Sequence, residues 1–96
     1  MKQFYVPYSG KRPAALSING HRLLILASDP TIMEGELEVF GADHVKRIDG
    51  GASKQEESKL IERLSRDAKA GVVIAPADIG LSELLRNLEH ELPWLQ

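Results

Sequence analysis

The sequence predicts one α/β domain in which an N-terminal β-hairpin precedes the order strand, helix, strand, helix, strand, helix, with a partly parallel sheet in two or three layers. Three observations support this prediction. Asn19-Gly20 separates two apolar runs, as in a type I′ hairpin turn. The runs 23–27 and 72–75 are apolar at consecutive positions, which is typical of strands covered on both faces. Leucines at helical spacing over 81–92 predict a final amphipathic helix.

The N-terminal segment 4–8, "FYVPY", is rich in aromatic and β-branched residues and therefore predicts a strand. Pro7 cannot donate a hydrogen bond to a ladder, so we expect this strand at an edge of the sheet. A loop is expected over 9–13. The hairpin then joins 14–18 to 21–27, and we expect this N-terminal hairpin to extend one edge of the sheet.

The segment after the hairpin favours a helix. Asp29 and Pro30 fit the N-cap and first position, because proline lacks only an N–H that would be unpaired there. Apolar residues then recur at i, i+4 and i+7, namely Met33, Leu37 and Phe40. Gly41 stands where a left-handed C-cap is expected. A strand over 36–40, where apolar and acidic residues alternate, is the alternative, and Gly35 inside the expected helix keeps it open.

The next two elements are a short strand at 44–48 and a helix over about 54–70, joined by the loop "DGGAS" at 49–53. Ser53 and Glu56 have the spacing of a capping box, which satisfies backbone N–H groups at the start of a helix. One face of this helix is apolar and comprises Leu60, Ile61, Leu64 and Ala68. Gly71 is expected to end it.

We expect the runs 23–27, 44–48 and 72–75 to be parallel strands, because strands that alternate with helices are joined by crossover connections. The final helix ends before Pro93. Trp94 and Leu95 are expected to fold back onto the core, since an exposed Trp-Leu tail would leave a large apolar surface in water.

Length and composition limit the classes of protein. A chain of 96 residues with 43% hydrophobic and 27% charged residues is typical of a single globular domain, here 1–96. The absence of cysteine excludes disulfides and Cys-based metal or nucleophilic sites, and a reducing cytoplasm is the expected location. The apolar run 23–27 is far shorter than a membrane span, and 1–10 has no apolar core of signal-peptide length. We therefore expect a soluble protein without membrane contact.

The carboxyl ends of the three expected parallel strands lead into polar segments, and ligands of open α/β sheets bind at such ends. The candidate ligand-binding residues are Asp29, Thr31, Asp49, Gly50, Gly51, Ser53 and Asp78. Carboxylate oxygens suit Mg²⁺ or acid–base chemistry, and Ser and Gly amides suit a small phosphate ligand. The favoured interpretation is nevertheless that these residues cap helices and turns, because stability alone selects Asp and Ser there.

The known catalytic and cofactor motifs are missing. "DGGAS" lacks the spacing of the G-x-G-x-x-G fingerprint, so no dinucleotide cofactor is expected. The three histidines, His21, His44 and His90, form no i, i+4 pair, which argues against a metal. No G-x-S-x-G elbow occurs, so no catalytic residue is assigned.

Charge is distributed unevenly along the chain. Residues 1–28 carry four basic and no acidic residues, whereas the whole chain has a net charge of −2. Within this basic segment Lys11, Arg12 and Arg22 are the candidates for contact with an anion or nucleic acid. A net acidic domain makes nucleic acid an unfavourable partner, and a solvated loop is the favoured interpretation.

The sequence therefore leads to three hypotheses. The first is a small, non-catalytic binding or regulatory module that acts through protein–protein contacts. Both chain ends, 4–8 and 92–96, carry aromatic and apolar residues, which homodimers often bury, although packing within one chain is equally consistent. The second is a domain, with or without catalysis, that binds phosphate, a nucleotide or a Mg²⁺-dependent ligand through the aspartates at the strand ends. The third is a weak nucleic-acid binder that uses the basic hairpin.

Overall fold

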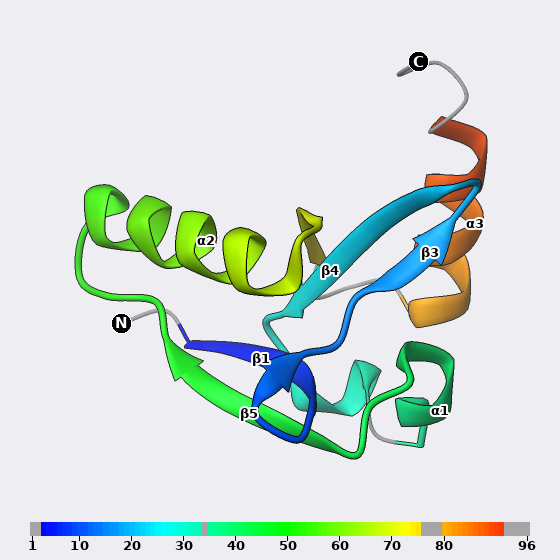
Figure 1. Ribbon diagram of the computed structural model, residues 1–96, viewed down its shortest axis with the longest axis horizontal. Helices are drawn as coiled ribbons and strands as arrows, with labels where there is room; N and C mark the ends of the chain where they lie inside the picture. Colours follow the sequence, from blue (N-terminus) through cyan, green and yellow to red (C-terminus); the bar gives the residue numbers. More distant parts are fainter. Residues whose placement is uncertain (1–2, 34, 76–79, 92–96) are drawn as a thin grey trace.

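The computed structural model describes residues 3–33, 35–75 and 80–91 (Figure 1). Its strands are β1 (Gln3–Ser9), β2 (Arg12–Pro13), β3 (Leu16–Ile18), β4 (His21–Ala27), β5 (His44–Asp49) and β6 (Gly71–Ala75). Its helical elements are the 3-10 turn η1 (Pro30–Ile32) and the helices α1 (Leu37–Phe40), α2 (Lys54–Ala68) and α3 (Leu81–Glu91). The strands form one mixed six-stranded sheet, so the predicted α/β fold with a partly parallel sheet is confirmed.

The sheet is built around β1 and β4. Strand β1 pairs antiparallel with β5 from Gln3↔Asp49 to Tyr8↔His44, and on its other side with β2 and with Ala27 at the end of β4. Strand β4 pairs antiparallel with β3 at its start and parallel with β6 over 23–27. Among the described residues, β5 and β6 each pair with a single neighbour, so each has one unpaired side.

The prediction that 4–8 lies at an edge of the sheet is wrong, because β1 has strands on both sides. Pro7 is tolerated inside the sheet for a geometric reason. Its C=O accepts a hydrogen bond from the N–H of Ala14, at 2.8 Å, and the C=O and N of one residue in a strand point to the same side. The missing N–H of Pro7 is therefore directed toward the Ala14 side, where the short β2 ladder ends, and the long ladder with β5 is intact.

The expectation of three parallel strands is confirmed for β4 and β6 but is wrong for the pairing of β5. Both sides of β4 are already occupied, by β6 on one and by β3 and β1 on the other, so β5 pairs antiparallel with β1 instead. Its residues also suit an outer position, since all of them are exposed or half-buried. Because two antiparallel pairings separate β5 from β4, the two strands still run in the same direction.

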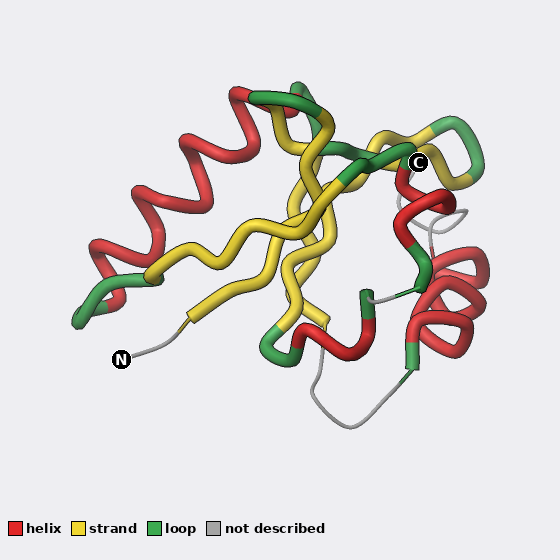
Figure 2. Tube along the Cα trace, turned by 90° about the horizontal axis from the view of Figure 1, so that it is seen from below, coloured by secondary structure: helices red, strands yellow, loops and turns green. Residues whose placement is uncertain are grey.

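Helices cover both faces of the sheet (Figures 1 and 2). Alternate side chains of β4 belong to two different clusters: Leu24 and Leu26 pack in one, and Leu23 and Ile25 in the other. The first cluster comprises Phe4, Val6, Tyr8, Leu24 and Leu26 with Leu60, Leu64 and Ala68 of α2. The second contains Met33, Phe40 and the α3 residues Leu81, Leu84 and Leu88. The run 23–27 is buried throughout, as its sequence predicts.

The turn at Asn19-Gly20 has the predicted form. Both residues have positive φ, 52° and 83°, as a type I′ turn requires, and Ile18 pairs with His21 across it.

The segment 29–41 contains two short helical pieces instead of the single helix that the spacing favours. Asp29 caps η1 with Pro30 at its first positions, and Gly41 ends α1 in the left-handed conformation with φ of 66°, so these signals are confirmed. Gly35, with φ of 81°, interrupts the helix between them. The alternative strand over 36–40 does not form.

Helix α2 begins as predicted, with the Ser53 side chain accepting a hydrogen bond from the Glu56 N–H. It ends at Lys69, which adopts the left-handed cap with φ of 53°, and not at Gly71. The expected fold-back of Trp94 and Leu95 lies outside the described residues. In the described part of the chain, no helix is long and apolar enough to cross a membrane.

Candidate functional site

The carboxyl ends of β4, β5 and β6 lie along one edge of the sheet. Tyr5 of β1 lies opposite both Arg47 and Ala27, and Ala27 lies opposite Ala75. The segments that follow β4 and β5 therefore leave the sheet from the same edge. Asp78, the third aspartate predicted for this edge, lies outside the described residues.

The Asp29 side chain accepts hydrogen bonds from within its own turn. One carboxylate oxygen accepts hydrogen bonds from the Thr31 N–H, at 2.9 Å, and from the Thr31 hydroxyl, at 2.8 Å. These bonds, with the backbone N–H contributing most, lower the pKa of Asp29 below its ordinary value. The interpretation of Asp29 and Thr31 as helix-capping residues accounts for all of these contacts.

The loop after β5 is likewise held by hydrogen bonds within the loop and to the start of α2. Asp49 accepts a hydrogen bond from the Gly51 N–H, at 2.8 Å, and Glu56 accepts one from the Ala52 N–H, at 2.7 Å. Gly51 has φ of 87°, and a Cβ added there would lie 2.5 Å from a Glu56 carboxylate oxygen. Glycine at this position is therefore required by the backbone and by the closeness of Glu56.

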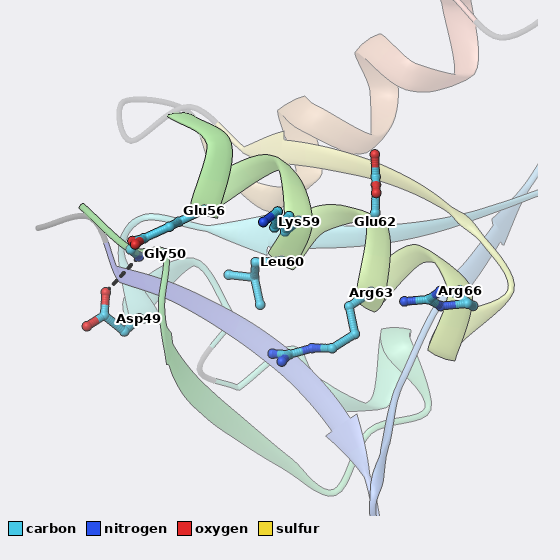
Figure 3. Close-up of a pocket in the computed structure, with 9 residues that line it drawn as sticks. Asp49, Gly50, Glu56, Lys59, Leu60, Glu62, Arg63 and Arg66 are labelled. Carbon is cyan, nitrogen blue, oxygen red and sulfur yellow. Dashed lines mark hydrogen bonds between the residues drawn. The ribbon is translucent and has the colours of Figure 1, made fainter. Parts of the chain in front are cut away.

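A groove of about 560 Å³ runs between this loop and one flank of α2, and we call it the α2 groove (Figure 3). Its lining residues are Asp49, Gly50, Gly51, Glu56, Lys59, Leu60, Glu62, Arg63 and Arg66. Of the predicted site residues, Asp49, Gly50 and Gly51 line it, whereas Asp29, Thr31 and Ser53 do not. The predicted aspartate cluster therefore does not form one pocket among the described residues.

Basic residues of this groove were not among the predicted site residues. Lys59, Arg63 and Arg66 follow one another at i, i+4 and i+7, so they share one flank of α2. Figure 3 shows Arg63 extending toward the strands while Glu62 points the opposite way. Within the described ranges, no carboxylate forms an ion pair with any of the three cations. Their helical spacing, visible in the sequence, was the signal that could have identified them.

Lys46 of β5 joins these cations on the same face of the sheet. It lies opposite Val6, whose side chain packs with α2, and cross-strand partners share a face. The Lys46 ammonium lies 5.1 Å from the centroid of the Tyr8 ring, a cation–π contact. We call Lys46, Lys59, Arg63 and Arg66 the basic strip.

Tyr8 lies between β5 and α2 and is only 8% exposed. Its ring also contacts His44, with the centroids 5.8 Å apart. Burial raises the pKa of the Tyr8 phenol, the Asp67 carboxylate raises it further, and the Arg63 guanidinium acts in the opposite direction. Tyr8 is therefore a packed residue beneath the basic strip.

Asp43 ties the start of β5 to the β1–β2 turn. It accepts a hydrogen bond from the Gly10 N–H, at 3.0 Å, and its other oxygen contacts Nδ1 of His44. The His44 ring and the Gly10 N–H lower the pKa of this exposed carboxyl group. This arrangement fixes the beginning of β5.

The predicted basic candidates of the hairpin are partly brought together. Arg12 and Arg22 line a depression of about 250 Å³ with Lys69, whereas Lys11 does not. Arg22 donates a hydrogen bond to the C=O of Ala68, at 3.2 Å. It thus satisfies a carbonyl at the end of α2, where a cation is favourable, and its role is structural.

The described residues contain no cluster of three or more His, Asp or Glu side chains that could hold a metal ion. In the same ranges, every buried side-chain polar atom has a hydrogen-bond partner. Comparison with protein-family models, curated proteins and solved structures finds no match to this chain.

Proposed function

We propose that this protein is a non-catalytic binding module that contacts another protein through the outer edge of β5. The observation that carries the proposal is the open ladder of this strand. Strand β5 pairs with β1 along its whole length and, among the described residues, with nothing on its other side. A peptide in extended conformation binds such an edge by adding one more strand to the sheet.

The direction of the backbone groups in β5 follows from the ladder. The C=O of Tyr8 accepts a hydrogen bond from the Asp43 N–H, so Tyr8 directs its backbone groups toward β5, whereas Pro7 directs its C=O toward Ala14. Backbone groups alternate in direction along a strand, so Phe4, Val6 and Tyr8 bond toward β5. The backbone groups of their partners Ile48, Lys46 and His44 therefore form the hydrogen bonds of the β1–β5 ladder.

It follows that Val45 and Arg47 direct their N–H and C=O groups outward. These two residues lie opposite Pro7 and Tyr5, whose backbone groups point away from β5. A segment two to four residues long could pair with both. Main-chain hydrogen bonds would then supply affinity, and side chains on the two faces would supply specificity.

The polar residues at the strand ends support binding over catalysis. Asp29, Asp49 and Ser53 each accept a hydrogen bond from a backbone N–H within three residues of their own position. Such bonds are the capping contacts that stabilise turns and helix ends. A role in holding the backbone accounts for each of these side chains without a ligand.

Selection of peptides tests the proposal. Random twelve-residue peptides displayed on phage would be selected on the wild-type protein, and each enriched peptide would be measured against Arg47→Pro and Arg47→Ala. Proline removes the outward N–H, while alanine keeps it and provides the matched control for the lost side chain. We expect Arg47→Pro to abolish binding of most enriched peptides and Arg47→Ala to retain it.

Two results would refute the proposal. One is a set of enriched peptides that bind Arg47→Pro as well as wild type, which would place the contact elsewhere. The other is a response to inorganic phosphate, Mg²⁺ or ATP in which amide NMR shifts concentrate at Thr31, Gly50 and Gly51. That pattern would assign a small-ligand site to the strand ends.

A further inference from the structure

We infer that the segment accepted by β5 is acidic, with carboxylates that meet the basic strip on the α2 side of the sheet. This inference rests on the proposed function, because it specifies the chemistry of the partner at the same edge. An added strand would lie about 4.8 Å beyond β5, and alternate side chains would point to the α2 face. Those side chains are the ones that the basic strip would meet.

The basic strip spans both elements that border the α2 face. Lys46 is on β5 itself, next to the position of an added strand, and Arg63 extends from α2 toward the strands (Figure 3). Both approach Tyr8, since the Lys46 ammonium lies over its ring and the Arg63 charge acts on its hydroxyl group. Lys46 therefore contacts this buried side chain, and Arg63 extends from α2 toward the same face of the sheet.

Cations and anions around this face differ in their contacts. The nearby carboxylates of Asp43, Asp49 and Glu56 each accept a hydrogen bond from a backbone N–H. In the described part of the chain, no carboxylate pairs with Lys46 or Arg63. Asp67 of α2 also acts on Tyr8, and Glu62 lines the groove but points away from the strands, so the four cations of the basic strip outnumber the carboxylates at this face. A partner with carboxylates complements this excess of positive charge.

A second copy of this chain is a poor occupant of the edge. Antiparallel pairing in which the outward groups of Val45 and Arg47 meet those of Arg47 and Val45 in the other copy would place Lys46 opposite Lys46. Like charges directly opposite each other destabilise a strand pair, and lysine on an edge strand is a known means of preventing self-association. The charges therefore favour a different, acidic segment.

Nucleic acid also fits this face less well than an acidic peptide. Single-stranded nucleic acid binds through bases that stack on exposed aromatic rings. In the described residues, Phe4, Tyr8 and Phe40 are buried and Tyr5 is partly buried. This face combines cations with the unpaired edge of β5. A polypeptide can bind both, because its backbone pairs with the edge and its carboxylates pair with the cations.

The test compares two synthetic peptides of equal length and strand propensity. In one, Glu alternates with Val over eight residues, and in the other Lys replaces Glu. Binding would be measured by fluorescence anisotropy at low and at physiological salt. Each exposed ion pair is worth up to about 1 kcal/mol, which corresponds to about fivefold in affinity.

We expect the Glu peptide to bind at least about tenfold more tightly than the Lys peptide at low salt, with the difference falling as salt rises. The variants Lys46→Ala and Arg63→Ala should each weaken binding of the Glu peptide by about three- to fivefold. Lys54→Ala is the matched control, because this cation of α2 does not line the groove, and it should leave the affinity unchanged.

The outcomes separate this inference from the proposed function. Equal binding of both peptides that is lost in Arg47→Pro would overturn the acidic preference and leave the edge-binding proposal standing. Binding of the Glu peptide that persists in Arg47→Pro would overturn both. Tighter binding of a labelled oligothymidine than of the Glu peptide, weakened in Lys46→Ala and Arg63→Ala, would also overturn the inference and assign the strip to nucleic acid.

Discussion

Arg47 lies opposite Tyr5 in the β1–β5 ladder, and its backbone N–H points away from that ladder, to the side where no described strand pairs with β5. The amides of Val45 and Arg47 should therefore exchange with solvent as fast as those of a loop. The amides of Lys46 and Ile48 point into the ladder and should be protected by about a hundredfold or more relative to them. Hydrogen exchange followed by NMR at neutral pH measures all four. Stronger protection of Val45 and Arg47 than of Lys46 and Ile48 would contradict the account, because it would show that Val45 and Arg47 form the hydrogen bonds to β1.

Proline substitutions on β5 should differ sharply in their effect on stability. Lys46→Pro removes an N–H that bonds to β1, so the free energy of unfolding should fall by about 2–3 kcal/mol. Arg47→Pro removes an outward N–H and should cost about 1 kcal/mol or less. Urea unfolding of both variants beside Lys46→Ala and Arg47→Ala isolates the backbone effect. Equal losses of unfolding free energy in the two proline variants would contradict the alternation of inward and outward N–H groups along β5.

Gly51 should tolerate alanine less well than another glycine of positive φ. Gly51→Ala combines a left-handed conformation with a Cβ 2.6 Å from Cβ of Glu56, and we expect a loss of about 2–3 kcal/mol. Gly41→Ala, at φ of 66° with no atom within 4 Å of the added Cβ, should lose only about 1 kcal/mol. Thermal unfolding at neutral pH compares them. A smaller loss for Gly51→Ala would mean that the loop after β5 is not held as described.

The loss of folding stability at acid pH should depend on Asp43. Its pKa is lowered in the folded state, so its contribution is present above the ordinary aspartate value of 3.8 and is lost as the pH falls through the lowered value. Asp43→Asn should therefore make unfolding less pH-dependent below about pH 4 than in the wild type. His44→Ala, which removes the largest cause of the lowered pKa, should have the same effect in part. Unfolding midpoints from pH 7 to pH 2.5 test this, and unchanged slopes in both variants would refute it.

Local signals in the sequence predicted the local structure well. The Asn19-Gly20 turn, the Asp29-Pro30 start and the Ser53 cap each depend on a few neighbouring residues, and each formed as predicted. The position of β1 was mispredicted because Pro7 was judged by its missing N–H alone. Whether that N–H is needed depends on which way the residue faces, and this is determined by strands far away in the sequence.

The candidate site was harder to predict than the fold. Asp29 and Asp49 were singled out because acidic residues at strand ends suit both caps and ligands, and their contacts are those of caps. The basic strip depends on the pairing of β5 with β1, which brings Lys46 to the same face as Arg63. That pairing joins segments about forty residues apart, so local patterns do not reveal it.

The most direct test of the account measures the exchange of the Val45 and Arg47 amides while the alternating Glu-Val peptide saturates the protein. Pairing of the peptide with the outer edge of β5 predicts that both amides become protected, while the amides of Thr31, Gly50 and Gly51 keep the exchange rates of the unbound protein. Saturated binding that leaves Val45 and Arg47 unprotected would contradict the account, because the peptide would then occupy a different surface.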